Sequence, residues 1–77
     1  MPAVSEIDLM NVDWPGSLLQ CNTELDRMQC GDRLDVLVND PEIAQTLMLV
    51  INRAENLSAR LVEQNGEIRI SVDKICQ

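Results

Sequence analysis

Residues 7–19 read IDLMNVDWPGSLL, a pattern that predicts a short strand, a turn and the beginning of a helix. Ile7 and Leu9 alternate with Asp8, as expected for a half-buried strand that extends over about residues 5–10. Pro15 is tolerated in the first turn of a helix, so the helix is expected to begin close to it.

The helix that follows Pro15 is expected to present one apolar stripe and to end near Gly31. Ser17 and Gln20 have the spacing of a capping box, so the first residue of the helix is defined only to within a few positions. The apolar side chains that recur at helical spacing are Leu18, Cys21, Leu25 and Met28.

A second strand and a second helix are predicted from the middle of the chain. Apolar and polar residues alternate over residues 33–38, which indicates a strand. Asp40 is a favoured N-cap residue, Pro41 suits the first helical position, and Glu42 lies near the positive end of the helix dipole. We expect this helix to end near Asn56.

The last part of the chain is typical of a β-hairpin. Ala59 and Leu61 indicate a third strand, and Asn65-Gly66 is a strong signal for a two-residue hairpin turn. Residues 67–73 then alternate regularly between polar and apolar side chains. The chain therefore ends in two strands joined by a tight turn.

The predicted order is β-α-β-α-β-β, which is an α/β two-layer sandwich. Right-handed crossovers place both helices on one face of a four-stranded mixed sheet. The polar members of each strand then line the other face. A length of 77 residues fits a single domain, 1–77, with its core at about 4–74.

The charge of the chain limits the classes of partner. It has 13 acidic and 6 basic residues and no histidine, for a formal net charge of −7. Such a surface repels phosphate backbones, so we expect no direct binding of nucleic acid. Two readings stay open: a charged surface that serves solubility, or an acidic face that docks on a basic protein. No apolar run is long enough for a membrane span, and the first residues lack signal-peptide features, so we expect no membrane insertion and a cytoplasmic location.

The side chains that bind metals and cofactors are scarce. The three cysteines are an odd number without an export signal, so free, reduced thiols are expected. The absence of histidine and of a Cys-x-x-Cys pair argues against a zinc site, and no Gly-rich phosphate loop occurs. We therefore expect no metal and no cofactor.

The opening stretch resembles the TusA/SirA-like sulfur-carrier family, in which an apolar-Asp pair precedes a Gly, then Cys-Pro-x-Pro, then a helix. Without gaps, Asp8 and Pro15 match this pattern. Asn11 takes the place of the Gly, Trp14 that of the Cys, and Ser17 that of the second Pro. Asn tolerates the left-handed backbone angles that glycine adopts readily, so the turn is expected to survive the first exchange.

The resemblance continues along the chain, over about residues 4–74. The later landmarks that agree at matching distances are Gly31, Leu34, Val36, Asp40-Pro41 and Gly66. Individually they are common features, and together they imply the fold of the family. They coincide with the order of elements expected from the residues alone.

In the family the motif cysteine carries a persulfide, and Trp14 has no nucleophile to replace it. The resemblance therefore implies a degenerate, non-catalytic member that works as a protein-binding or regulatory module in sulfur transfer. Its partner would be a cysteine desulfurase or a sulfurtransferase, with Asp13, Trp14, Pro15 and Ser17 as the contact corner. Trp14 has two readings: it packs over the seam between helix and sheet, or it is an exposed anchor.

Other cysteines leave a second function open. Cys21 lies on the apolar stripe of the first helix, and Cys30 lies in the following turn, far from Trp14. Cys76 is the fallback thiol, because it follows the last strand and would act as a sulfur or redox carrier at the C-terminus. A third interpretation is a divergent homologue whose role has left sulfur metabolism.

Overall fold

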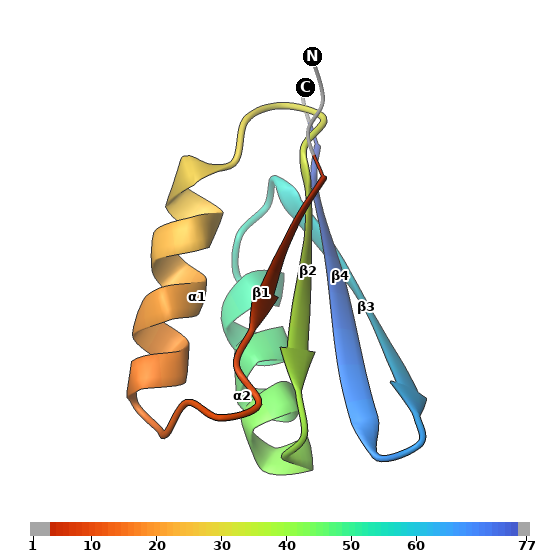
Figure 1. The fold of residues 1–77 in the computed structure, drawn as a ribbon. Helices are drawn as coiled ribbons and strands as arrows, with labels where there is room; N and C mark the ends of the chain where they lie inside the picture. Colours follow the sequence, from red (N-terminus) through yellow and green to blue (C-terminus); the bar gives the residue numbers. More distant parts are fainter. Residues whose placement is uncertain (1–3, 76–77) are drawn as a thin grey trace.

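The computed structural model describes residues 4–75 (Figure 1). The elements follow the order β1 (Val4–Asp8), α1 (Gly16–Arg27), β2 (Arg33–Val38), α2 (Pro41–Asn52), β3 (Leu57–Gln64) and β4 (Glu67–Lys74). This is the predicted order. The strands form a sheet with spatial order β1-β2-β4-β3, in which β1 pairs with β2 in parallel and the other pairs are antiparallel. The prediction of a mixed sheet is confirmed.

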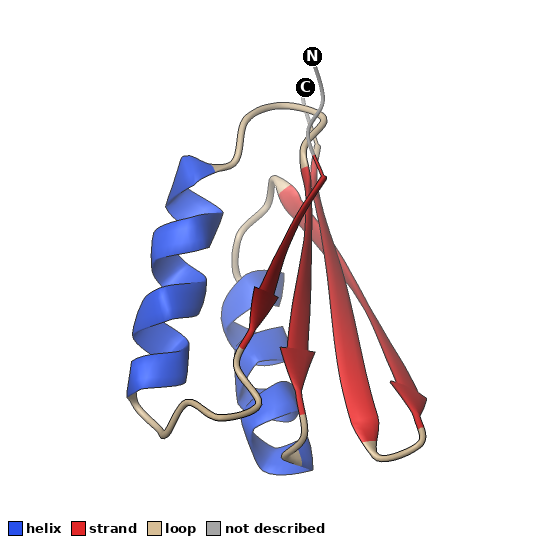
Figure 2. Cartoon of the chain, viewed as in Figure 1, coloured by secondary structure: helices blue, strands red, loops and turns tan. Residues whose placement is uncertain are grey.

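Both helices lie against the same face of the sheet, and the other face is open (Figures 1 and 2). The central strands β2 and β4 supply half of the buried side chains of the core cluster between the two layers. The fully buried ones are Leu34, Val36, Val38, Ile70 and Val72 from these strands, Leu47 and Ile51 from α2, and Cys21 and Ser17 from α1. The two-layer arrangement is thus confirmed. None of the helices in residues 4–75 is long and apolar enough to cross a membrane.

The start of α2 follows the predicted capping pattern. Asp40 is the N-cap, and its Oδ1 accepts a hydrogen bond from the Glu42 N–H at 2.9 Å. Pro41 occupies the first helical position, where no amide hydrogen is needed. The local sequence therefore fixes where this helix begins.

The end of α2 lies at Asn52, so the expected extension to Asn56 is wrong. The N–H of Arg53 donates to the Val50 carbonyl, and that of Ala54 donates to the Ile51 carbonyl. Each of these hydrogen bonds spans three residues, as in a 3₁₀-helix, so the last turn is tighter and the α-helix ends there. The segment before β3 is consequently a turn, which the apolar spacing of the sequence does not reveal.

The hairpin between β3 and β4 has the predicted turn. Asn65 has a φ of 53° and Gly66 a φ of 79°, the two positive values that a type I′ turn requires. From this turn the strands pair without interruption as far as Leu57 and Lys74. This regular ladder makes β3 an eight-residue strand.

The boundaries of α1 differ from the expectation at both ends. The helix begins at Gly16, and no side-chain hydrogen bond caps it, so the capping box of Ser17 and Gln20 does not form. It ends at Arg27 and not near Gly31, because Met28 has an extended backbone. Gly31, with a φ of 87°, belongs to the turn that leads into β2.

Candidate functional site

The loop between β1 and α1 brings the predicted contact residues to the beginning of the helix. Asp8 Oδ1 accepts a hydrogen bond from the Met10 N–H at 2.9 Å, and the Val12 N–H donates to the Leu9 carbonyl at 3.2 Å. These two bonds turn the chain away from the end of β1. Residues 13–15 then lead directly into α1.

The loop is held against the first turn of α1. A Cβ atom added to Gly16 would lie 3.3 Å from Val12 Cγ1, so a side chain here would press on the loop. Asn11 has no positive φ, since Asn65 is the non-glycine residue of the described chain that adopts one. The left-handed conformation considered for Asn11 is therefore not used.

The N-terminus of α1 has backbone bonds but no side-chain cap. The Ser17 N–H donates to the Asp13 carbonyl, and the Leu19 N–H donates to the Pro15 carbonyl, both at 3.1 Å. The carboxylate of Asp13 does not act as the cap that its position permits, and the first turn of the helix contains no acidic residue. The positive end of the helix dipole therefore has no side-chain counter-charge within the helix.

Trp14 is exposed at this helix start, with 45% of its surface accessible. Asp13 and Pro15 on either side of it are exposed as well. Ser17 is fully buried, and its Oγ has no hydrogen-bond partner among the described residues. Three of the four predicted contact residues therefore share an accessible surface, and Ser17 does not belong to it.

Cys21 is buried one turn further along the helix than Ser17, on the same face. It is 1% exposed, and burial raises the pKa of its thiol to about 11. A thiol with this pKa is almost fully protonated at neutral pH, and the thiolate is the nucleophile. Cys21 is therefore a core residue and a poor sulfur acceptor, as its place on the apolar stripe predicts.

Cys30 is disulfide-bonded, so the expectation of free thiols is wrong for this residue. Its turn lies beside the end of β4, where the Gly31 N–H donates to the Lys74 carbonyl at 3.0 Å. The number and spacing of cysteines in a sequence do not show which of them the fold brings together. Cys76, the fallback thiol, lies outside the described residues.

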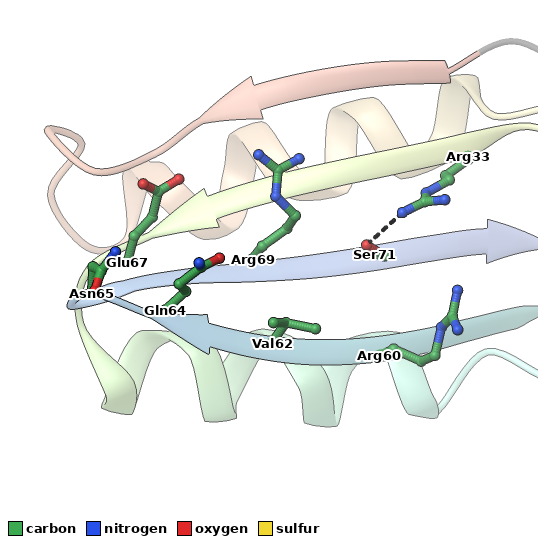
Figure 3. Close-up of a pocket in the computed structure, with 8 residues that line it drawn as sticks. All are labelled: Arg33, Arg60, Val62, Gln64, Asn65, Glu67, Arg69 and Ser71. Atoms are coloured by element: carbon green, nitrogen blue, oxygen red, sulfur yellow. Dashed lines mark hydrogen bonds between the residues drawn. The ribbon is translucent and has the colours of Figure 1, made fainter.

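A second cluster of polar side chains lies on the open face of the sheet. The guanidinium groups of Arg33, Arg60 and Arg69 surround a hollow of about 470 Å³ above β3 and β4 (Figure 3). Asp35 holds two of them: Arg33 Nε lies 3.1 Å from its Oδ1, and Arg69 Nη1 lies 2.8 Å from its Oδ2. The alternation of each strand predicts a polar face, but only the strand register brings these arginines together.

Asp35 is the buried acid of this cluster, with 8% of its surface accessible. Burial alone would raise the pKa of its carboxyl group, but hydrogen bonds from Arg33, Ser71 and Arg69 outweigh this and hold it below the ordinary value. Arg33 Nη2 also donates to Ser71 Oγ at 3.1 Å, and Arg69 Nη1 pairs with Glu6 Oε2 at 3.2 Å. Within residues 4–75, no group of three or more Cys, Asp or Glu side chains is placed to hold a metal ion.

Comparison with known proteins gives one family. A family model described as Sulfurtransferase TusA matches residues 5–74, which include almost all of β1 and every later element. No curated protein and no solved structure matches the chain.

Proposed function

The chain belongs to the TusA sulfurtransferase family, whose members relay sulfur between protein partners, and we propose that this member binds such a partner without carrying sulfur at the usual position. Its partner would be a cysteine desulfurase or a sulfurtransferase. The contact surface would consist of Asp13, Trp14 and Pro15 at the start of α1.

The loss of the carrier function is inferred from the residue at position 14. In the gap-free alignment with the family motif, Trp14 takes the place of the cysteine and Pro15 that of the following proline. A cysteine just before a helix would face amide groups and the positive end of the dipole, which favour an anionic sulfur. The helix start is present here, but an indole offers one N–H donor and no sulfur.

The two cysteines within residues 4–75 do not replace the missing thiol. Cys21 is buried with a raised pKa, and Cys30 is disulfide-bonded. Neither is located at the start of α1, where the motif places the persulfide. This supports a member of the family that has kept the scaffold without the reactive atom.

The observation that carries the binding proposal is the exposure of Trp14. An accessible tryptophan offers a large apolar surface to a partner, and tryptophan is enriched among residues that dominate binding energy. A Trp14 packed over the seam between α1 and the sheet would have removed this anchor. The accessibility of 45% of the Trp14 surface supports its proposed role as an anchor.

The net charge indicates the character of the partner surface. Asp13 is exposed next to Trp14, and the chain carries a formal net charge of −7. A partner with a basic rim around an apolar pocket would match both features. The protein would thereby occupy the docking surface of a sulfur donor and regulate its access to true carriers.

The test is the affinity for a cysteine desulfurase measured by calorimetry with native protein and Trp14→Ala. We expect Trp14→Ala to weaken binding by about tenfold or more, as for a central anchor residue. Leu49→Ala is the matched control, because Leu49 is 66% exposed on α2 and should leave binding unchanged. Equal losses in both variants, or none in Trp14→Ala, would contradict the proposal.

A carrier that uses Cys76 is the alternative function. It is distinguished by loading the protein with sulfur from a desulfurase and mapping the modified residue. Loading of the native protein at Cys76, its loss in Cys76→Ser and its persistence in Cys21→Ser would favour this function over the binding proposal.

A further inference from the structure

β3 is a long and regular edge strand, and its only protection against pairing is the charge of Arg60 and Glu63. It lies at one end of the sheet, beside β4 (Figure 1). It is eight residues long, contains no proline or lysine, and pairs with β4 without a bulge. Proteins usually shorten, bend or charge such edges, because an exposed edge accepts other strands. The opposite edge, β1, is shorter, with five residues, and carries Glu6 and Asp8.

The backbone groups on the free edge can be assigned from the neighbouring hydrogen bonds. Residues of an antiparallel strand direct their N–H and C=O groups alternately to either side. The Lys74 N–H donates to the Asp32 carbonyl, and the Lys74 carbonyl accepts from the Gly31 N–H, so Lys74 faces the β2 side. The Ile75 N–H donates to the Asn56 carbonyl at 2.8 Å, on the β3 side.

By this alternation, the odd-numbered residues of β4 pair with the even-numbered residues of β3. The odd-numbered residues of β3 therefore point their N–H and C=O groups away from β4. The Leu57 N–H is already bonded to the Ala54 carbonyl, which leaves Ala59, Leu61 and Glu63 for the free edge. An incoming strand would find a regular set of donors and acceptors there.

The exposed side chains of β3 define what such a strand would contact. Leu61 is 42% exposed on the helix side of the sheet, and Val62 is 56% exposed on the open side. Arg60 is on the open side and makes no ion pair or side-chain hydrogen bond with a described residue. Figure 3 shows Arg60 and Val62 along the strand that borders the hollow.

Three arginines, Arg33, Arg60 and Arg69, and one acid, Glu67, line the hollow, and this excess of positive charge favours an acidic segment. Arg33 and Arg69 share the carboxylate of Asp35, so the positive charge of Arg60 is left without a counter-charge of its own. A carboxylate beside Arg60 would supply this counter-charge, and its two oxygens could accept two parallel hydrogen bonds from the guanidinium. The net charge of the whole chain acts over longer distances, where salt screens it. We propose that the free edge of β3 accepts an extended acidic segment of another protein as an added strand.

A second copy of the chain is a poorer occupant of this edge. In an antiparallel pair of two β3 strands, opposite residues lie on the same face of the sheet. Arg60 would then be opposite an even-numbered residue of the second copy, none of which is acidic, and never opposite Glu63, which points to the other face. Self-pairing thus offers Arg60 no charge complement.

The test uses two blocked eight-residue peptides, one of alternating valine and glutamate and the other of alternating valine and lysine. As added strands they place all charged residues on one face of the sheet. We expect the glutamate peptide to bind about tenfold more tightly than the lysine peptide. Arg60→Glu is expected to reverse this preference.

Leu61→Pro separates strand addition from simple charge attraction. Proline at Leu61 removes an outward N–H and no bond to β4, so the variant should keep its fold by circular dichroism. We expect it to lose binding of the glutamate peptide, while Leu61→Ala, which keeps the N–H, retains most of it. Equal affinity for both peptides, no affinity for either, or unchanged binding by a folded Leu61→Pro would overturn the proposal. A dimer of the native protein that Leu61→Pro dissociates would assign the edge to a second copy instead.

Discussion

Trp14 and Cys21 lie about two helical turns apart at the beginning of α1, yet one is 45% exposed and the other 1% exposed. The side chain at the accessible helix start therefore has no sulfur, and the nearby thiol cannot reach a partner. This division between an exposed tryptophan and a buried cysteine is the structural basis of the proposed binding role.

Replacing Trp14 with cysteine should restore sulfur acceptance. The loop from β1 and the uncapped helix start are present, so a thiol at this position would meet the positive end of the helix dipole. We expect Trp14→Cys to gain sulfur during incubation with a cysteine desulfurase and free cysteine, as measured by intact mass. Leu49→Cys, an exposed thiol in the middle of α2, is the control that should stay unmodified. Equal loading of both variants would show that exposure alone decides acceptance.

The buried thiol of Cys21 should make stability depend on alkaline pH. Its pKa is about 11 in the folded protein against an ordinary value of 9.0, so unfolding releases a proton above pH 9. The stabilising contribution is complete below pH 9 and is lost as the pH rises toward 11, with a total of about 2–3 kcal/mol. Urea unfolding of native protein and Cys21→Ala at pH 8 and pH 10.5 measures this. The absence of tyrosine simplifies the comparison. An equal pH dependence in both proteins would contradict the assignment.

Asp35→Asn should destabilise the protein, because it removes the charge that pairs with Arg33 and Arg69. We expect a loss of about 1–3 kcal/mol in the free energy of unfolding, measured with urea at pH 7. The lowered pKa of Asp35 also means that its contribution exists above the ordinary pKa of 3.8 and is lost as the pH falls through the lower folded value. The native protein and Asp35→Asn should thus become more similar in stability in acid. Asp26→Asn, an exposed acid, is expected to change stability by less than about 0.5 kcal/mol.

The cap of α2 gives a prediction about the fold itself. Asp40→Ala removes the acceptor for the Glu42 N–H and should cost about 1 kcal/mol of stability. Asn39→Ala, at the preceding exposed position, is the control with little expected effect. A thermal shift of the same size in both variants would mean that the cap is not a determinant of stability.

The sequence predicts elements that local chemistry defines. Asp40 and Pro41 set the start of α2, and Asn65-Gly66 sets the hairpin, because a cap and a type I′ turn depend on adjacent residues. The capping box of Ser17 fails because its side chain turns into the core, one helical turn from Cys21. Whether a serine caps a helix or faces the sheet depends on packing, which the spacing does not contain.

The second polar cluster could not be predicted, because it depends on strand register. Arg33, Arg60 and Arg69 lie on three different strands, and the pairing of β2, β4 and β3 brings them to one hollow. The disulfide at Cys30 is not predictable for a similar reason, because the spacing of cysteines in a sequence does not show which of them pair. At the helix start, the sequence predicts the position of Trp14, but its exposure depends on how the loop packs.

The most direct test of the central claim is the intact mass of the native protein after incubation with a cysteine desulfurase and free cysteine. The protein is first reduced and desalted, because Cys30 is disulfide-bonded. A family member that retains Cys-Pro-x-Pro serves as the positive control in the same reaction. The account predicts that the control gains sulfur and that this protein keeps its original mass. Stable addition of sulfur to this protein, mapped to any of Cys21, Cys30 or Cys76, would show that it is a carrier and would contradict the account.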